Sequence, residues 1–152
     1  MDIYLFLYLV FVVAPIGTII HECGHLFGAW ATQADRITLS IGRGKQIMSF
    51  SGKKMQITIH AIFFLGGLAQ SKRTTPYKAI EIIWVTFCGL VSSSIFAFLF
   101  YFLYNAYPSP YIQLLFLFNG WLAIVNSIPF KIKGMQSDGY TICKVILQSG
   151  KK

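Results

Sequence analysis

Two histidines and a glutamate stand close together near the start of the chain, in the order His21-Glu22-Cys23-Gly24-His25. This order matches the pattern H-E-x-x-H. On a helix, residues four apart lie on the same face, so the two imidazoles can converge on one Zn²⁺. Glu22 then lies beside the metal, where it can take a proton from zinc-bound water. The motif therefore predicts a hydrolytic zinc site with His21 and His25 as ligands and Glu22 as the general base.

A catalytic zinc site usually has a third protein ligand and one open position. The chain has five acidic residues, which are Asp2, Glu22, Asp35, Glu81 and Asp138. Glu22 is the predicted base, Asp2 is expected outside the membrane, and Asp35 follows the same helix too closely to fold back easily. Glu81 stands near basic residues, where an ordinary interfacial ion pair accounts for it. By elimination, Asp138 is the expected third ligand, and a turn residue or helix cap in the Asp-Gly pair is the alternative.

The cysteines and the third histidine are not assigned to the metal. Cys23 lies two positions from His21, which turns it to another face of a helix. The three cysteines, Cys23, Cys88 and Cys143, are too few and too dispersed for a disulfide framework. His60 stands in a strand-like run, where a partly exposed strand histidine is the expected role.

These residues belong to a chain that is mostly apolar. Hydrophobic residues make up 55% and charged residues 12% of it, against roughly 25% charged in a soluble domain. Of the 13 Lys and Arg residues, eight fall within 36–78 and five within 131–152, and none within 1–35 or 79–130. Basic residues confined to alternate loops follow the positive-inside rule. The net charge of +8 therefore indicates cytoplasmic loops, and no nucleic-acid partner is predicted.

Three apolar runs are long enough to cross a bilayer, which takes about 20 helical residues. They cover approximately 3–31, 79–104 and 111–128. The first run lacks a basic start and is too long for a cleaved signal peptide. The basic loops place the N-terminus outside and the C-terminus in the cytoplasm, so we expect a multi-pass protein of the cell membrane.

The chain changes character between the first two spans. Ile37, Leu39 and Ile41 alternate with polar residues, and turn signals follow at 42–44 and 51–54. This pattern predicts a small, membrane-associated antiparallel sheet. The sheet region covers about 36–68, and its apolar, Gly-rich part, 61–68, is expected to dip into the membrane beside the helices. An edge of the sheet over 36–59 could capture an extended peptide by strand addition.

The C-terminal tail, 131–152, is too polar to span a membrane and is expected to hold a short amphipathic helix over 140–147. The chain shows no repeat and no linker, so 1–152 is predicted to form a single domain. The predicted fold class is an α-helical multi-pass membrane protein with three transmembrane helices. A small membrane-associated antiparallel β-sheet lies between the first and the second helix.

The position of the H-E-x-x-H motif is itself informative. The motif lies within the first apolar span, and a charged side chain at bilayer depth costs about 2.5–3.5 kcal/mol on insertion scales. An intramembrane acid beside two histidines is therefore a sign of function.

The motifs together resemble those of the site-2 protease family, the M50-type intramembrane zinc metalloproteases. In that family one membrane helix carries H-E-x-x-H, and a later helix carries N-x-x-P followed by D-G. The matching segments here are 21–25, then 126–129 (Asn-Ser-Ile-Pro), then 138–139 (Asp-Gly). The predicted sheet, followed by Gly-Gly at 66–67, also resembles the family's membrane-associated β-region. The resemblance covers nearly the whole chain.

The resemblance implies a minimal three-span core of an intramembrane zinc-dependent endopeptidase. It implies His21, His25 and Asp138 as zinc ligands, Glu22 as the catalytic base and Asn126 as a substrate contact. The implied substrate is a transmembrane or membrane-bound peptide or protein, which the enzyme would meet within the lipid bilayer.

The sequence departs from the family pattern at two places. The family often places D-G five residues after the proline, whereas Asp138 follows Pro129 by nine, with 131–134 as the insert. The family's second span often has G-P near its start, and here the chain has Gly89-Leu90.

Three alternatives remain open at this point. The chain could be a metal-binding membrane transporter, because intramembrane histidines and acids also mark ion pathways. It could be a catalytically inactive relative that binds membrane peptides. It could also be a different H-E-x-x-H membrane protease, in which only Glu81 is available as a glutamate ligand.

Overall fold

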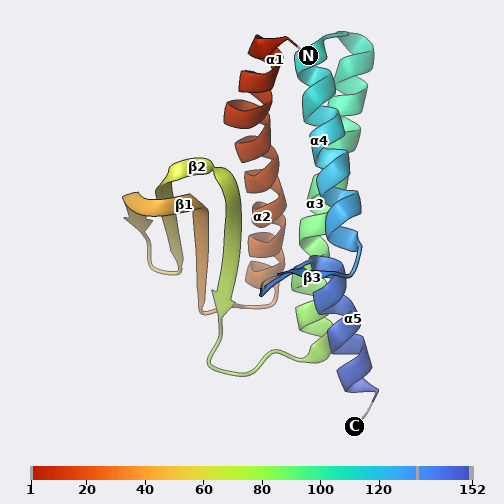
Figure 1. The fold of residues 1–152 in the computed structure, drawn as a ribbon. Coiled ribbons are helices and arrows are strands. Elements are labelled where there is room, and N and C mark those ends of the chain that lie inside the picture. Colours follow the sequence, from red (N-terminus) through yellow and green to blue (C-terminus); the bar gives the residue numbers. More distant parts are fainter. Residues whose placement is uncertain (1, 133, 151–152) are drawn as a thin grey trace.

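A computed structural model describes residues 2–132 and 134–150 (Figure 1). In chain order the elements are α1 Ile3–Tyr8, η1 Leu9–Val13, α2 Ala14–Ala31, β1 Arg36–Ser51, β2 Met55–Lys72, α3 Ala79–Ala106, α4 Pro110–Ser127, β3 Lys131–Ile132, β4 Met135–Gln136 and α5 Asp138–Ser149. Helices α2, α3 and α4 stand side by side, and the β1–β2 sheet lies against the flank of α2 (Figure 1). The protein is thus helical with a small antiparallel sheet, as predicted.

Two long apolar helices have the length and composition to cross a membrane within the described part of the chain. One is Ile3–Ala31, which comprises α1, η1 and α2, and the other is Ala79–Ala106, or α3. They occupy the positions predicted for the first two spans. The helix expected over 111–128 forms as α4, but it contains two asparagines and a glutamine and is not one of these two. The third span therefore stays a prediction.

A wide π-helical turn at Leu9–Val13 interrupts the first long helix, and hydropathy alone does not predict it. Pro15 follows directly. A proline has no N–H to donate, and its ring clashes with the carbonyl four residues earlier, here that of Phe11. In the wide turn the N–H of Ala14 bonds to the carbonyl of Leu9, five residues back. The wider turn accommodates the proline without breaking the helix.

Helices α2 and α3 approach closely through two glycines on α2. A Cβ added at Gly24 would lie 2.7 Å from Ser92 Cβ and 2.8 Å from Gly89 Cα. A Cβ added at Gly28 would lie 2.8 Å from Val85 Cα. Small residues four apart allow helix backbones to pack closely in membranes. The glycines therefore bring the H-E-x-x-H helix directly against α3.

Strands β1 and β2 both bend, so that each contributes two segments to the sheet. The sheet is therefore four segments wide although it contains only two strands. Segment 36–41 lies between 55–59 and 67–72, and segment 46–51 pairs with the outer side of 55–60. The edge that faces α2 is therefore 67–72. The expectation that the edge over 36–59 takes up a peptide is wrong for 36–41, because both of its sides are already paired.

The sheet also extends beyond the predicted region, since β2 continues to Lys72. Segment 61–68 forms the bend of β2 and the start of its edge segment. Gly66 adopts φ +79°, a conformation that L-residues rarely take, and the chain turns there. Phe63 and Phe64 pack on Phe11 of the first helix, with ring centroids 6.5 and 5.0 Å apart. The bend thus lies beside the helix, as expected, although it is part of the sheet.

Arg73 joins the end of the sheet to the helices. Its Nη1 donates to the carbonyl of Thr32 at the end of α2, 2.7 Å away. Its guanidinium also pairs with Glu81 on α3, with Nη2 2.7 Å from Oε2. This contact confirms the ion pair expected for Glu81. Nearby, hydrogen bonds from Thr74 hold the pKa of Asp35 below its usual range.

The tail contains a longer helix than predicted. Helix α5 covers Asp138–Ser149, whereas the amphipathic pattern indicates only 140–147. The capping side chain of Ser137 accepts a hydrogen bond from the Tyr140 N–H, 3.1 Å away, and this cap starts the helix early. Positions 133, 151 and 152 of the predicted tail lie outside the described residues.

Replacement of Gly28 by alanine is expected to destabilise the protein, because the new Cβ meets the backbone of α3. Overpacking typically costs about 1–3 kcal/mol. We expect the melting temperature of the detergent-solubilised protein to fall by about 2–4 °C per kcal/mol. Gly120→Ala on α4 is the matched control, because nothing lies within 4 Å of its added Cβ and alanine favours helix. Equal melting temperatures for both variants would contradict close α2–α3 packing.

Candidate metal centre

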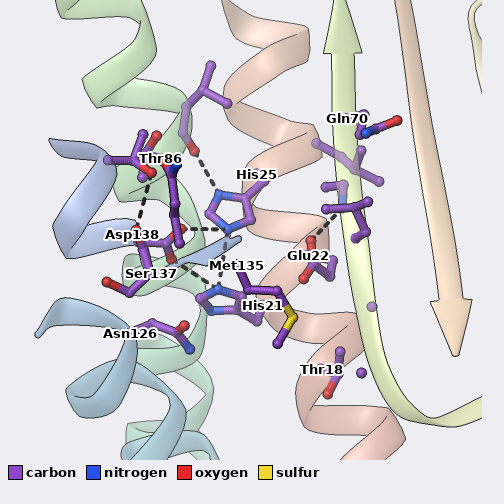
Figure 2. A pocket seen from close by; sticks show the side chains of 18 of the residues that line it. Thr18, His21, Glu22, His25, Gln70, Thr86, Asn126, Met135, Ser137 and Asp138 are labelled. Atoms are coloured by element: carbon purple, nitrogen blue, oxygen red, sulfur yellow. Dashed lines mark hydrogen bonds and ion pairs between the residues drawn. The ribbon is translucent and has the colours of Figure 1, made fainter. Parts of the chain in front are cut away.

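His21, His25 and Asp138 meet where α2 lies beside the first turn of α5 (Figure 2). His21 Nε2 lies 3.1 Å from Asp138 Oδ2, and His25 Nε2 lies 3.4 Å from Asp138 Oδ1. The two Nε2 atoms are 3.2 Å apart. One ligand atom from each residue lies within 4.8 Å of the others. The structure therefore brings together the three residues that the sequence selects as ligands.

Helix α3 orients both imidazoles. His25 Nδ1 lies 3.0 Å from the Val85 carbonyl oxygen, which only accepts, so Nδ1 donates and Nε2 carries the lone pair. His21 Nδ1 lies 3.0 Å from Ser93 Oγ, and Ser93 is fully buried. When Ser93 Oγ accepts a hydrogen bond from the Nδ1–H of His21, the Nε2 atom of His21 also carries a lone pair. Such partners commonly orient metal-binding histidines, and the sequence alone does not indicate either one.

A glycine on α3 makes room for one imidazole. A Cβ added at Gly89 would meet the His25 ring, with Nε2 only 2.5 Å away. Helix α3 is continuous from Ala79 to Ala106, so it does not end or restart at Gly89. The missing side chain therefore gives the His25 ring the space that it occupies against α3.

Ser137 closes the loop between Pro129 and Asp138 and so positions Asp138 at the candidate metal centre. Its Oγ donates to the Ile128 carbonyl at 2.7 Å and accepts from the Phe130 N–H at 3.0 Å. The Ser137 N–H donates to the Phe130 carbonyl at 3.1 Å. These bonds tie the ends of the loop together, and the extra residues project as the β3–β4 hairpin. Asp138 consequently reaches the histidines despite its unusual distance from Pro129.

The three residues fit a metal ion. Asp138 Oδ2 is buried and makes no hydrogen bond to any described residue, although His21 Nε2 is close. Lone pairs that face one another at these distances repel, and a cation offsets that repulsion. Two imidazole nitrogens and one carboxylate oxygen form a donor set typical of catalytic zinc. The group therefore offers three donor atoms of the kinds expected for a zinc site.

Glu22 turns its carboxylate toward the sheet. Its Oε2 accepts a hydrogen bond from the backbone N–H of Ala69 at 2.6 Å. Figure 2 shows Glu22 between the histidines and strand β2. The predicted base thus lies between the metal centre and the edge segment 67–72. Sequence reasoning missed Ala69, because a backbone amide leaves no signal in the residue type.

An open cavity of about 690 Å³ connects these groups. It lies among α2, the edge segment of β2, the end of α4, the hairpin and α5. Its polar lining includes Thr18, His21, Glu22, His25, Gln70, Ser71, Thr86, Asn126, Gln136, Ser137, Asp138 and Thr141. Asn126 lines the cavity as well as donating from Nδ2 to the Leu122 carbonyl at 3.0 Å. The candidate ligands, Glu22 and Asn126 therefore all line one cavity.

The other residues considered as ligands lie elsewhere. His60 Nδ1 lies 3.3 Å from the Ile41 carbonyl oxygen within the sheet. Cys23 is exposed on the outer side of α2. Asp35 accepts from the Thr74 N–H at 2.7 Å. None of these three joins the His21, His25 and Asp138 group.

Comparison with protein families gives a match over most of the chain. The sequence model described as peptidase family M50 matches residues 6–109. The matched range contains His21, Glu22, His25 and the sheet, and it ends before Asn126 and Asp138. No curated protein matches the chain.

Replacement of Ser93 by alanine is expected to weaken zinc binding by about 10–100-fold, as loss of a partner that orients a metal-binding histidine typically does. Competition with a chromogenic chelator measures the affinity. Ser94→Ala is the matched control, because Ser94 Oγ donates to the Leu90 carbonyl of its own helix. Equal affinities in the two variants would show that Ser93 does not orient His21.

Proposed function

Since the chain belongs to peptidase family M50, a family of membrane zinc metalloproteases, we propose that it is an intramembrane zinc endopeptidase. It hydrolyses a peptide bond in or near a transmembrane or membrane-bound substrate. The proposal rests above all on the convergence of His21, His25 and Asp138 within one cavity. Glu22 lies beside this group and next to a strand edge.

His21, His25 and Asp138 would hold the zinc ion, and helix α3 orients the two histidines. When bound, zinc supplies a Lewis acid that polarises a carbonyl and acidifies water. Glu22 takes a proton from the attacking water while the water oxygen bonds to the carbonyl carbon. Glu22 then gives that proton to the amide nitrogen as the C–N bond breaks. The carboxamide of Asn126 contacts the substrate from the α4 side of the cavity.

The substrate is proposed to bind as an extended strand. Residues 67–72 form the edge facing α2, and the Ala69 N–H points away from β1 toward Glu22. Because backbone direction alternates along a strand, Gly67 and Ser71 also point their backbone groups outward. An edge of this kind can take up a peptide by strand addition. A helical substrate must first unwind locally, which residues of low helix propensity would favour.

We place the protein in the cell membrane as a single domain with three spans, the third being α4. Many large apolar side chains are exposed on the helices, and they include Phe6, Phe11, Phe27, Trp84, Phe98, Phe102 and Leu117. A lipid environment suits such a surface. The basic residues of the sheet and tail support a cytoplasmic position for both and an external N-terminus. The partners are then the lipid bilayer and a membrane-embedded substrate.

Glu22→Gln is expected to keep zinc and to lower the cleavage rate by at least about 10²–10⁴-fold, the usual contribution of a general base. Glutamine retains an oxygen that can accept from Ala69, so the local structure should persist. The assay follows cleavage of candidate membrane peptides in liposomes by mass spectrometry, with zinc content measured on the same samples.

Retained cleavage in purified Glu22→Gln protein would reject the proposed base. Metal flux through wild-type proteoliposomes without any peptide cleavage would favour a transporter. Peptide binding by zinc-loaded wild type without cleavage would favour an inactive peptide-binding relative.

Asp138→Ala is expected to lower the zinc content well below one ion per chain, because two histidines alone form an incomplete site. Asp35→Ala is the control, since Asp35 lies outside the group and its loss should leave the zinc content unchanged. Elemental analysis after dialysis measures the stoichiometry. Full zinc occupancy in Asp138→Ala would mean that another residue completes the coordination.

A further inference from the structure

The β3–β4 hairpin forms part of the cavity on the side of α4 and α5. Residues 134–138 line the cavity from this side, and residues 66–71 line it from the sheet. The hairpin extends from the junction of α4 and α5 across α2 toward the sheet (Figure 1). A peptide strand on the 67–72 edge would therefore lie between the sheet and the hairpin.

Met135 is the residue of this hairpin that reaches across the cavity. Its Sδ accepts a hydrogen bond from Arg43 Nη2 on β1, 3.1 Å away. Its side chain lines the same cavity as His21 and Glu22, and all three are labelled in Figure 2. The residue is 57% exposed although it is apolar. This apolar side chain thus lines the cavity of the metal centre without being buried by the protein itself.

The position of Met135 is well defined by the base of the hairpin. Lys131 pairs with Gln136 and Ile132 with Met135. Gly134 has φ +88°, which suits the tight turn between the two strands. The hydrogen bonds of Ser137 close the base directly beside Asp138. The hairpin and the ligand carboxylate therefore share one anchor.

We propose that β4 is the second wall of the substrate groove and that Met135 is a specificity-determining residue. An extended substrate segment lies between the 67–71 edge and β4, and Met135 covers a large apolar substrate side chain next to the scissile bond. Methionine suits this contact because its flexible, polarisable side chain adapts to apolar shapes. The proposal rests on the proposed proteolytic function. It adds to that function a preference for substrates with a large apolar side chain next to the scissile bond.

Ile132 provides a matched control within the same hairpin. It stands directly opposite Met135 in the register and is likewise 57% exposed and apolar. It does not line the cavity. Truncation of either side chain to alanine removes a similar exposed apolar surface, but only the truncation of Met135 changes the lining of the groove.

The first test compares cleavage by wild type, Met135→Ala and Ile132→Ala. The substrates are synthetic single-span peptides of about 25 residues in liposomes, with a central Asn-Gly pair and one flanking residue varied among Ala, Leu, Phe and Lys. In wild type, kcat/KM is expected to favour Leu and Phe over Ala at one position. Met135→Ala should reduce that preference by about tenfold, within the range for apolar pocket contacts. Zinc content, measured in parallel, should be equal in all three proteins.

An unchanged preference in Met135→Ala, with cleavage intact, would overturn the proposal. An equal loss in Ile132→Ala would also overturn it, because the effect would then belong to the hairpin as a whole and not to the groove contact.

A second test does not require catalysis. The photoreactive residue p-benzoylphenylalanine is placed at position 135 or 132 in the zinc-loaded Glu22→Gln protein, and the same peptides are irradiated with it. Cross-linking from 135 and not from 132 is expected, and mass spectrometry should map it beside the varied residue. If wild type cleaves no peptide but this cross-link forms, the proteolytic function fails and the groove stands. If wild type cleaves and 135 gives no cross-link, the groove assignment fails.

Discussion

The imidazole nitrogens of His21 and His25 and the carboxylate of Asp138 converge where α2, α3 and α5 meet, and a cation among them would offset the repulsion between their lone pairs. Each element contributes to this convergence. Close packing through Gly24 brings α2 against α3, where Ser93 and Val85 orient the two rings. In an apolar environment such interactions are stronger than in water, so an arrangement of this kind is costly unless it is occupied. The rest of the fold holds these three side chains in position.

Much of the site could be predicted because its signals are local. The one-turn spacing of His21 and His25 is a property of any helix, and the two long apolar runs indicate helices by composition alone. Asp138 could be selected because a chain with so few acids offers few alternatives. Its distance from Pro129 argued against it, and the structure shows why that distance is tolerated. The hydrogen bonds of Ser137 close the loop at its base, so loop length does not set the position of Asp138.

The features that sequence reasoning missed depend on contacts between distant residues. The pairing of segment 67–72 with 36–41 requires the turn at Gly66, and no alternation of residue types marks it. The bond from the Ala69 amide to Glu22 belongs to the backbone. Ser93 is one of three consecutive serines on α3, and only the packing of the helices decides which one meets His21. Local patterns therefore predict the candidate ligands, whereas the groups that orient them can be identified only from the fold.

The attachment of Arg73 to Thr32 and Glu81 has a consequence for where a bound strand would be cut. It fixes the end of the 67–72 edge relative to the helices that carry the ligands, so this edge cannot slide past the metal centre. A strand shifted by one residue presents all of its side chains to the opposite face, whereas a shift by two, or roughly 6.6 Å, restores them. Under the proposed strand addition, a bound peptide would thus shift along the edge only by even numbers of residues. Secondary cleavage sites in a substrate should then fall an even number of residues from the main cleavage site.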